Sequence, residues 1–180
     1  MSRRRAVVVG VAVAAGALVA GLWMALERYS PNAPGASAQP FFAQTFNVLD
    51  GKPQAMTQWE GQLVVVNFWA TWCPPCVEEM PDLQRVHDEY RSRGVSVVGL
   101  GIDSPSALRR FRDDHQLDLP LFAAGAAGSE LGRTLGNGSG ALPYTLLIDR
   151  KGRIVRAHLG QIRLAELRSW LDAQLGSSPR

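Results

Sequence analysis

Residues 63–76 read LVVVNFWATWCPPC and place the only two cysteines of the 180-residue chain directly after an apolar run. The run Leu63–Trp69 is typical of a strand buried on both faces of a sheet. If a helix follows, Cys73 lies at its N-terminus, where unpaired N–H groups and the helix dipole stabilise a thiolate. Cys76 lies one turn further along, within reach for a disulfide. The spacing therefore predicts a redox-active pair, with Cys73 as an exposed nucleophile and Cys76 as its resolving partner.

Other roles for a close cysteine pair fit this sequence less well. A structural zinc site needs about four ligands, but there is no second cysteine pair, and His87, His115 and His158 are scattered along the chain. Covalent haem attachment needs a histidine directly after the second cysteine, where Val77 stands. A purely structural disulfide is a weaker alternative, because so short a loop constrains the unfolded chain little. We therefore expect no metal and no cofactor.

The N-terminus predicts a membrane anchor. Arg3–Arg5 precede the uncharged span Ala6–Leu26, whose 21 residues would extend about 32 Å as a helix. This length favours a retained anchor over a cleaved signal, for which Ala36-Ser37-Ala38 would be the small-residue cleavage site. A twin-arginine signal at Ser2-Arg3-Arg4 is a weak alternative. Because positive flanks stay in the cytoplasm, we expect a single-pass inner-membrane protein whose domain faces the periplasm.

Composition divides the chain into three parts: the arginine flank and anchor at 1–28, an uncharged flexible linker at 29–40, and one domain at 41–180. Residues 1–39 hold four Arg and one Glu, whereas residues 40–180 hold fifteen basic and fifteen acidic side chains. The positive excess thus belongs to the membrane flank and not to a basic face of the domain. We expect no nucleic-acid partner.

Within the domain, the order of elements predicts an α/β sandwich with a mixed sheet flanked by helices. Asp50-Gly51-Lys52 indicates an N-terminal hairpin, and Asp149-Arg150-Lys151-Gly152 a second one near the C-terminus. The second hairpin is expected to pair strand 144–148 with strand 153–158. The other expected strands are 63–69, 95–102 and a short edge strand at 119–122. The expected helices are 74–93, 105–115, 129–135 and 163–175.

The stretch Phe68–Cys76 resembles the active-site motif of thioredoxin-like proteins. Trp59-Glu60-Gly61, Glu78-Glu79-Met80-Pro81 and Leu142-Pro143-Tyr144-Thr145 are similar to the TlpA and ResA branch. Those proteins are membrane-tethered thiol-disulfide oxidoreductases that face the bacterial periplasm, and several act in cytochrome c maturation. The resemblance covers about residues 41–175. It implies a thioredoxin-like fold and a protein-disulfide oxidoreductase.

The resemblance also implies roles for single residues. Cys73 would form the mixed disulfide with a partner, and Cys76 would resolve it. Pro143 resembles the family's cis-proline, beside which the backbone of Leu142 would pair with a substrate strand. Trp72, next to the nucleophile, is expected to be partly exposed and to form an apolar rim for docking.

A departure from thioredoxin concerns the acid near the cysteines. Thioredoxin carries an aspartate in the strand before its motif, where this chain has Asn67, and an amide cannot shuttle a proton. The TlpA and ResA branch uses a glutamate three residues after the second cysteine, which Glu79 matches. Burial would raise the pKa of this carboxyl and let it exchange protons. The alternative is that Glu78 and Glu79 are both solvated acids favoured by the helix dipole.

Reduction of partner disulfides is the preferred direction, because Pro74-Pro75 supplies neither a charge nor a side-chain donor to stabilise a strong oxidant. The implied partners are disulfide-bearing periplasmic proteins, such as apocytochrome c or copper-site proteins, and a membrane electron donor. One rival is a thiol peroxidase, although the threonine expected three residues before the nucleophile is Ala70. A second rival is a copper chaperone that uses both cysteines and a histidine.

Overall fold

The computed structural model describes residues 35–176, so the predicted membrane span and the first part of the predicted linker lie outside the described residues. Within 35–176, no helix is both long and apolar enough to span a bilayer. Seven strands form one sheet in the order β2-β1-β5-β4-β3-β6-β7. The strands are β1 (Thr45–Val48), β2 (Pro53–Ala55), β3 (Leu63–Trp69), β4 (Val95–Gly101), β5 (Leu121–Ala123), β6 (Tyr144–Ile148) and β7 (Ile154–Leu159).

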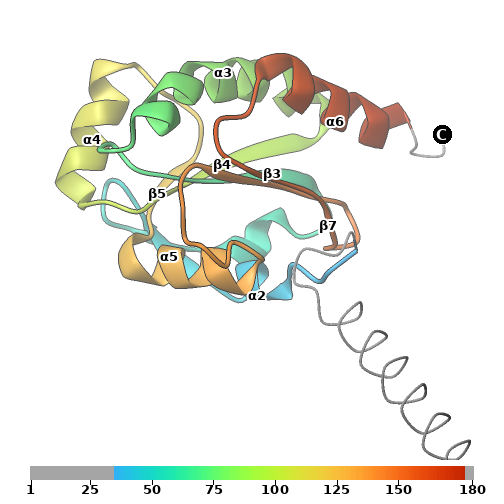
Figure 1. The fold of residues 1–180 in the computed structure, drawn as a ribbon, viewed down its shortest axis with the longest axis horizontal. Coiled ribbons are helices and arrows are strands. Elements are labelled where there is room, and N and C mark those ends of the chain that lie inside the picture. The colour runs from blue at the N-terminus through green and yellow to red at the C-terminus, as the bar shows by residue number, and fades with distance from the viewer. Residues whose placement is uncertain (1–34, 177–180) are drawn as a thin grey trace, which may run out of the picture. The chain divides into compact units, whose positions relative to one another are not determined.

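The sheet is mixed, as the sequence predicts. β3, β4 and β5 run parallel, whereas β1, β6 and β7 join the sheet by antiparallel pairing. Helices cover both faces of this sheet (Figure 1). One face carries α3 (Pro74–Tyr90), α4 (Pro105–Asp114) and α6 (Leu164–Gly176), and the other carries α2 (Gln39–Phe42) and α5 (Gly125–Thr134). This is the thioredoxin-like sandwich.

The central strand β3 feeds a separate apolar core on each face of the sheet. Val66 and Phe68 pack on the α2 and α5 side, whereas Val65 and Trp69 pack on the α3 side. Because side chains alternate along a strand, Asn67 shares the α3 face with Val65 and Trp69. The alternation therefore places one polar side chain beneath the helix that follows the cysteine motif.

Both predicted hairpins are confirmed. β1 pairs with β2 around Asp50-Gly51-Lys52, and β6 pairs with β7 across the turn at 149–152. Gly51 and Gly152 have φ values of 90° and 72°, a left-handed conformation that glycine adopts without the strain a Cβ would cause. Ser104 caps the N-terminus of α4, since its Oγ accepts a hydrogen bond from the Ala107 N–H.

Two predicted elements are corrected. The strand expected at the edge, β5, lies inside the sheet, because the N-terminal hairpin pairs with its outer side through β1. Helix α5 begins at Gly125, four residues before the predicted start. Its opening glycines have low helix propensity, so the sequence signal begins late. This early turn is nevertheless packed, since Gly128 is buried and a Cβ there would stand 2.5 Å from the Cβ of Ala124.

The predicted linker is also shorter than expected. From Gly35 onward the chain packs on the domain: the Gly35 N–H donates to the Ile154 carbonyl at 2.9 Å, and the Ala38 N–H donates to the Gly152 carbonyl at 2.8 Å. Ala38 is fully buried, and α2 starts at Gln39. Small uncharged residues thus serve here as a packed entry to the fold, which composition alone does not distinguish from a flexible tether.

Candidate active site

Cys73 lies at the N-terminus of α3, as the sequence predicts. It is the residue that precedes the first helical turn, and its carbonyl accepts a hydrogen bond from the Val77 N–H at 3.1 Å. Pro74 and Pro75 occupy the first helical positions, where an N–H would have no partner within the helix. The first turn carries no acidic side chain. The partial positive charge of the helix end therefore acts on Cys73 without competition from a carboxylate.

The two cysteines form a disulfide with a Cα–Cα distance of 5.3 Å. Cys73 is 5% exposed and Cys76 is fully buried. The expectation of an exposed Cys73 is therefore too strong, because Leu142 and other apolar side chains pack on the same core. The asymmetry between the two cysteines is nevertheless clear, since only Cys73 can be reached from solvent.

Trp72 stands out beside the disulfide with 66% of its surface exposed. Trp69, in contrast, is fully buried and packs on Phe111 with ring centroids 5.1 Å apart. Both assignments agree with the sequence analysis. An indole that is this exposed next to a reactive sulfur is suited to docking on an apolar partner surface.

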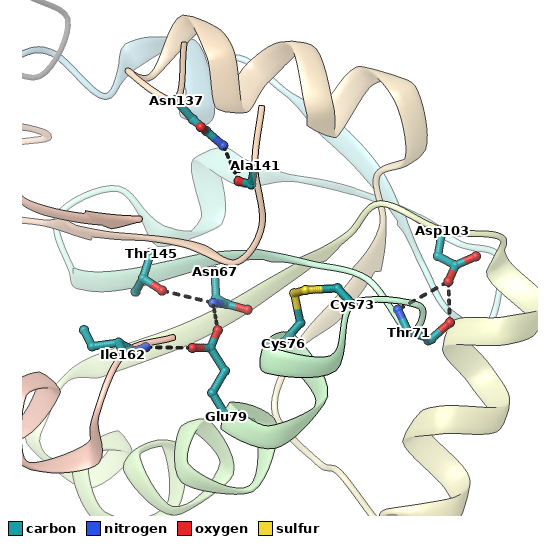
Figure 2. The surroundings of a disulfide bond; sticks show 10 residues. All are labelled: Asn67, Thr71, Cys73, Cys76, Glu79, Asp103, Asn137, Ala141, Thr145 and Ile162. Atoms are coloured by element: carbon teal, nitrogen blue, oxygen red, sulfur yellow. Dashed lines mark hydrogen bonds between the residues drawn. A yellow bond between two sulfur atoms is a disulfide. The ribbon is translucent and has the colours of Figure 1, made fainter. Parts of the chain in front are cut away.

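The loop that carries Trp72 is hydrogen-bonded to a residue at the end of the neighbouring strand β4. The N–H and the hydroxyl of Thr71 both donate to Oδ2 of Asp103, the N–H at 3.3 Å. Asp103, which follows β4 and is drawn with Thr71 in Figure 2, also accepts a hydrogen bond at its Oδ1 from the Ser104 N–H at 2.6 Å. One carboxylate thus connects the cysteine loop to the start of α4.

The peptide bond Leu142–Pro143 is cis, which confirms the conformation predicted for Pro143. Pro143 is buried, Leu142 is half-buried, and the Pro143 carbonyl accepts a hydrogen bond from the Gly160 N–H at 2.8 Å. The preceding loop is held by Asn137, whose Nδ2 donates to the Ala141 carbonyl at 2.8 Å. The segment expected to meet a substrate strand is therefore fixed on both sides.

Glu79 is buried, with 1% of its surface exposed, whereas Glu78 is exposed. The alternative that both are solvated acids is thus wrong for Glu79. Its Oε1 accepts from Asn67 Nδ2 at 2.7 Å and its Oε2 from the Ile162 N–H at 2.9 Å (Figure 2). Burial raises the pKa of Glu79 from 4.5 to about 7, against the two hydrogen bonds, which lower it; the charge of Asp82 raises it slightly further.

Asn67 connects Glu79 to the neighbouring strand. Its Nδ2 also donates to Thr145 Oγ1 at 3.0 Å, and both side chains are fully buried. Asn67 and Thr145 are direct register partners on β3 and β6, so their side chains lie on the same face of the sheet. Asn67 Oδ1 is buried and has no hydrogen-bond partner.

A single peptide group lies between Glu79 and His158. The Ile162 N–H donates to Glu79, while the carbonyl of Gln161 in the same peptide accepts from His158 Nε2 at 3.2 Å. His158 Nδ1 lies 3.4 Å from Glu166. The peptide group between Gln161 and Ile162 is therefore hydrogen-bonded at both its N–H and its carbonyl.

The histidines bear on the copper alternative. Both ring nitrogens of His158 are engaged as described above, and His115 stacks on Phe111 and donates from Nδ1 to its carbonyl at 2.9 Å. In the described residues, the only group of three side chains arranged to hold a metal is His87, Asp88 and Asp118, which includes neither cysteine. A copper site at the cysteine pair therefore gains no support from these positions.

The fold, the cysteine pair at a helix N-terminus and the cis-proline together define a thiol-disulfide oxidoreductase with a thioredoxin-like fold. The chain belongs to the AhpC/TSA family, whose model matches residues 34–157. At the position of the threonine expected of a thiol peroxidase, this chain has the fully buried Ala70.

Relatives and solved structures agree on the class. The chain is 34% identical over 113 residues to thiol-disulfide oxidoreductase ResA of Halalkalibacterium halodurans, an alignment that covers 62% of each chain. It is 32% identical over 124 residues to ResA of Bacillus thuringiensis, covering 68% of this chain and 69% of the relative. A thiol:disulfide interchange protein from Chlorobium tepidum superposes with a TM-score of 0.67 at 26% identity, covering 74% of this chain and 93% of that one.

Local motifs predict Cys73, Cys76 and Glu79 as reactive residues, but they do not predict the residues that form the surrounding hydrogen bonds. Thr145, Ile162 and Asp103 are separated from their partners by 78, 83 and 32 residues, so no local pattern links them. One signal was available. Asn67 interrupts an otherwise apolar central strand, and a buried amide needs polar partners on the same face.

Proposed function

We propose that this protein is a membrane-anchored periplasmic reductase that transfers electrons from its Cys73–Cys76 dithiol to disulfides of partner proteins. The substrates would be disulfide-bearing periplasmic proteins, with apocytochrome c and copper-site proteins as the leading classes. A membrane-bound dithiol donor would return the pair to its reduced form.

The observation that carries this proposal is the graded access along α3. Of the two cysteines only Cys73 has any exposed surface, whereas Cys76 is fully buried and Glu79 nearly so. Residues three apart lie on the same face of a helix, so the Glu79 carboxyl follows Cys76 by one turn. With its pKa raised to about 7, Glu79 can both accept and return a proton near neutral pH.

The exchange then proceeds in two steps. The Cys73 thiolate attacks one sulfur of the partner disulfide; the partner S–S bond breaks, a Cys73–partner bond forms, and the released partner thiolate takes a proton from water. Glu79 accepts the proton of the Cys76 thiol, and the Cys76 thiolate attacks Cys73 Sγ. The mixed disulfide breaks as the Cys73–Cys76 bond forms, and Glu79 returns its proton to the second partner thiolate. Two electrons leave the dithiol, and the partner gains two thiols.

The reducing direction rests on the surroundings of Cys73. Pro74 and Pro75 bring no cation and no side-chain donor, so they add nothing to the stabilisation of the thiolate by the helix terminus. A strong oxidant would need more stabilisation of its reduced form. The location rests on the arginines that precede the uncharged span of residues 6–26.

Trapping with a Cys76→Ala variant tests the reaction. The variant should accumulate mixed disulfides at Cys73, because no thiol remains to resolve them, and it should lose multiple-turnover reduction of a protein disulfide. A Cys73→Ala variant is the control and should trap nothing. Equal trapping by both variants, or full turnover without Cys76, would contradict the proposed roles.

Protease treatment of intact spheroplasts tests the location. Cleavage of the domain from outside is expected, and its protection would overturn the outward orientation. The mass of the protein isolated from cells without protease treatment distinguishes a retained anchor from a removed signal segment.

A further inference from the structure

The hydrogen bonds around Glu79 suit its ionised form. Each carboxylate oxygen faces an N–H donor: Asn67 Nδ2 on one side and the backbone N–H of Ile162 on the other. The second hydrogen of the Asn67 amide bonds Thr145 Oγ1. Asn67 Oδ1 is left buried without a partner, which is costly for an amide oxygen. In the view of Figure 2, this oxygen is directed toward the side on which the disulfide lies.

Protonation of Glu79 changes the hydrogen-bond partner that the carboxyl needs, from a donor to an acceptor. A neutral carboxyl must donate a hydrogen bond, but both of its neighbours are donors. The Ile162 N–H cannot turn, because it is backbone and the other end of its peptide is bonded by His158. The Asn67 amide can turn by a half-turn about its Cβ–Cγ bond, which exchanges Oδ1 and Nδ2.

We propose that Asn67 is a positioning residue that reverses its side-chain amide each time Glu79 gains or loses its proton. In the reversed orientation Oδ1 accepts hydrogen bonds from the Glu79 hydroxyl and from the Thr145 hydroxyl. Thr145 suits both states, because a hydroxyl accepts in one and donates in the other. One amide atom is unpaired in either state, Oδ1 before and Nδ2 after, so the amide serves both forms of the acid.

This role rests on the proposed function, in which Glu79 carries the proton of Cys76. It also explains why an amide on β3 is compatible with an acid on α3. The amide never holds the transferred proton; it supplies a donor to the carboxylate and an acceptor to the carboxylic acid.

The groups around Glu79 leave the protonation of Glu79 itself as the event that determines the orientation of the Asn67 amide. On α3 the nearby charge is Asp82, and Glu78 is exposed. β3 and β6 present the uncharged Asn67 and Thr145, and the segment before α6 presents a peptide N–H with His158 behind it. In the oxidised protein the two cysteines do not titrate. The oxidised state therefore isolates the response of the amide to Glu79.

Nuclear magnetic resonance of the oxidised full chain, labelled with 13C and 15N, tests the reversal. The Asn67 Nδ2 protons and the Glu79 carboxyl carbon are followed across about pH 5 to 9, and His158 is followed by its own ring signals. At high pH both amide protons should resonate downfield, because they bond Glu79 and Thr145. As the pH falls both should move upfield, with the midpoint of the Glu79 carbon and not that of His158.

Glu79→Gln supplies a fixed mimic of the protonated acid. Its side-chain oxygen accepts from Ile162 and its N–H₂ donates, so the Asn67 amide should show the low-pH signals at every pH. Glu78→Gln is the matched control and should titrate as the wild type. Asn67 signals that keep their high-pH positions through the Glu79 titration, or that still titrate in Glu79→Gln, would overturn the inference. Failure of the proposed function would appear separately, as absent disulfide reduction in the turnover assay, which this titration does not use.

Discussion

Replacing Glu79 by glutamine should remove a pH-dependent part of the stability of the fold. The pKa of this carboxyl is about 7 in the folded protein and returns to its ordinary value of 4.5 when the chain unfolds. Because the folded-state pKa is the higher one, the stabilising contribution is complete below the unfolded pKa and is lost as the pH rises through the folded pKa. At about 1.36 kcal/mol per pH unit, the wild-type free energy of unfolding should fall by about 3 kcal/mol between about pH 4.5 and 8, relative to the variant.

Urea unfolding of the oxidised wild type, Glu79→Gln and Glu78→Gln at about pH 4.5, 6, 7 and 8 measures this difference. The difference between Glu79→Gln and wild type should grow with pH in favour of the variant, with most of the change below about pH 7. Glu78 is exposed, so its variant should follow the wild type. A difference that stays constant with pH to within about 0.5 kcal/mol would show that Glu79 has an ordinary pKa and would refute the reasoning.

Three further predictions concern the reaction. Glu79→Gln should flatten the pH dependence of protein-disulfide reduction between about pH 5 and 8 while Glu78→Gln leaves it unchanged; identical curves for all three proteins would exclude proton transfer by Glu79. The Cys73 thiol should titrate below the free-cysteine pKa of about 8.5, measured by thiolate absorbance in Cys76→Ala, because it lies at a helix N-terminus; a value at or above 8.5 would contradict this. Trp72→Ala should lower kcat/KM for a protein disulfide about tenfold and leave reduction of a small aromatic disulfide unchanged, and an equal loss on both would show that Trp72 does not serve docking.

Much of the reactive centre was predictable because its parts are close in the sequence. An apolar strand, a cysteine pair with prolines and an acid one turn further along are local patterns, and each leads to one structural outcome: β3, the N-terminus of α3 and the buried side of that helix. The burial of Glu79 and not Glu78 follows from the same helix, since Cys76, Glu79 and Leu83 recur on its core face.

The remainder depends on pairings that no local pattern encodes. β5 is an interior strand because β1, which belongs to the hairpin at the start of the domain and is far from β5 in sequence, pairs with its outer side. The docking of Gly35–Pro40 depends on backbone hydrogen bonds to the turn and strand at 152–154. In each case the deciding contact is between segments whose composition predicts a more exposed position.

The position of the amide on β3 and of the acid on α3 has a physical consequence. An aspartate at position 67 would place a second carboxyl within hydrogen-bonding distance of Glu79, and two buried carboxyls that close share one proton and titrate as a pair. With an amide on the strand, Glu79 titrates as a single group whose pKa is set mainly by burial. The acid then lies on the same helix as Cys76, so the spacing between the proton acceptor and the resolving thiol is fixed by helix geometry and not by the packing of helix on sheet.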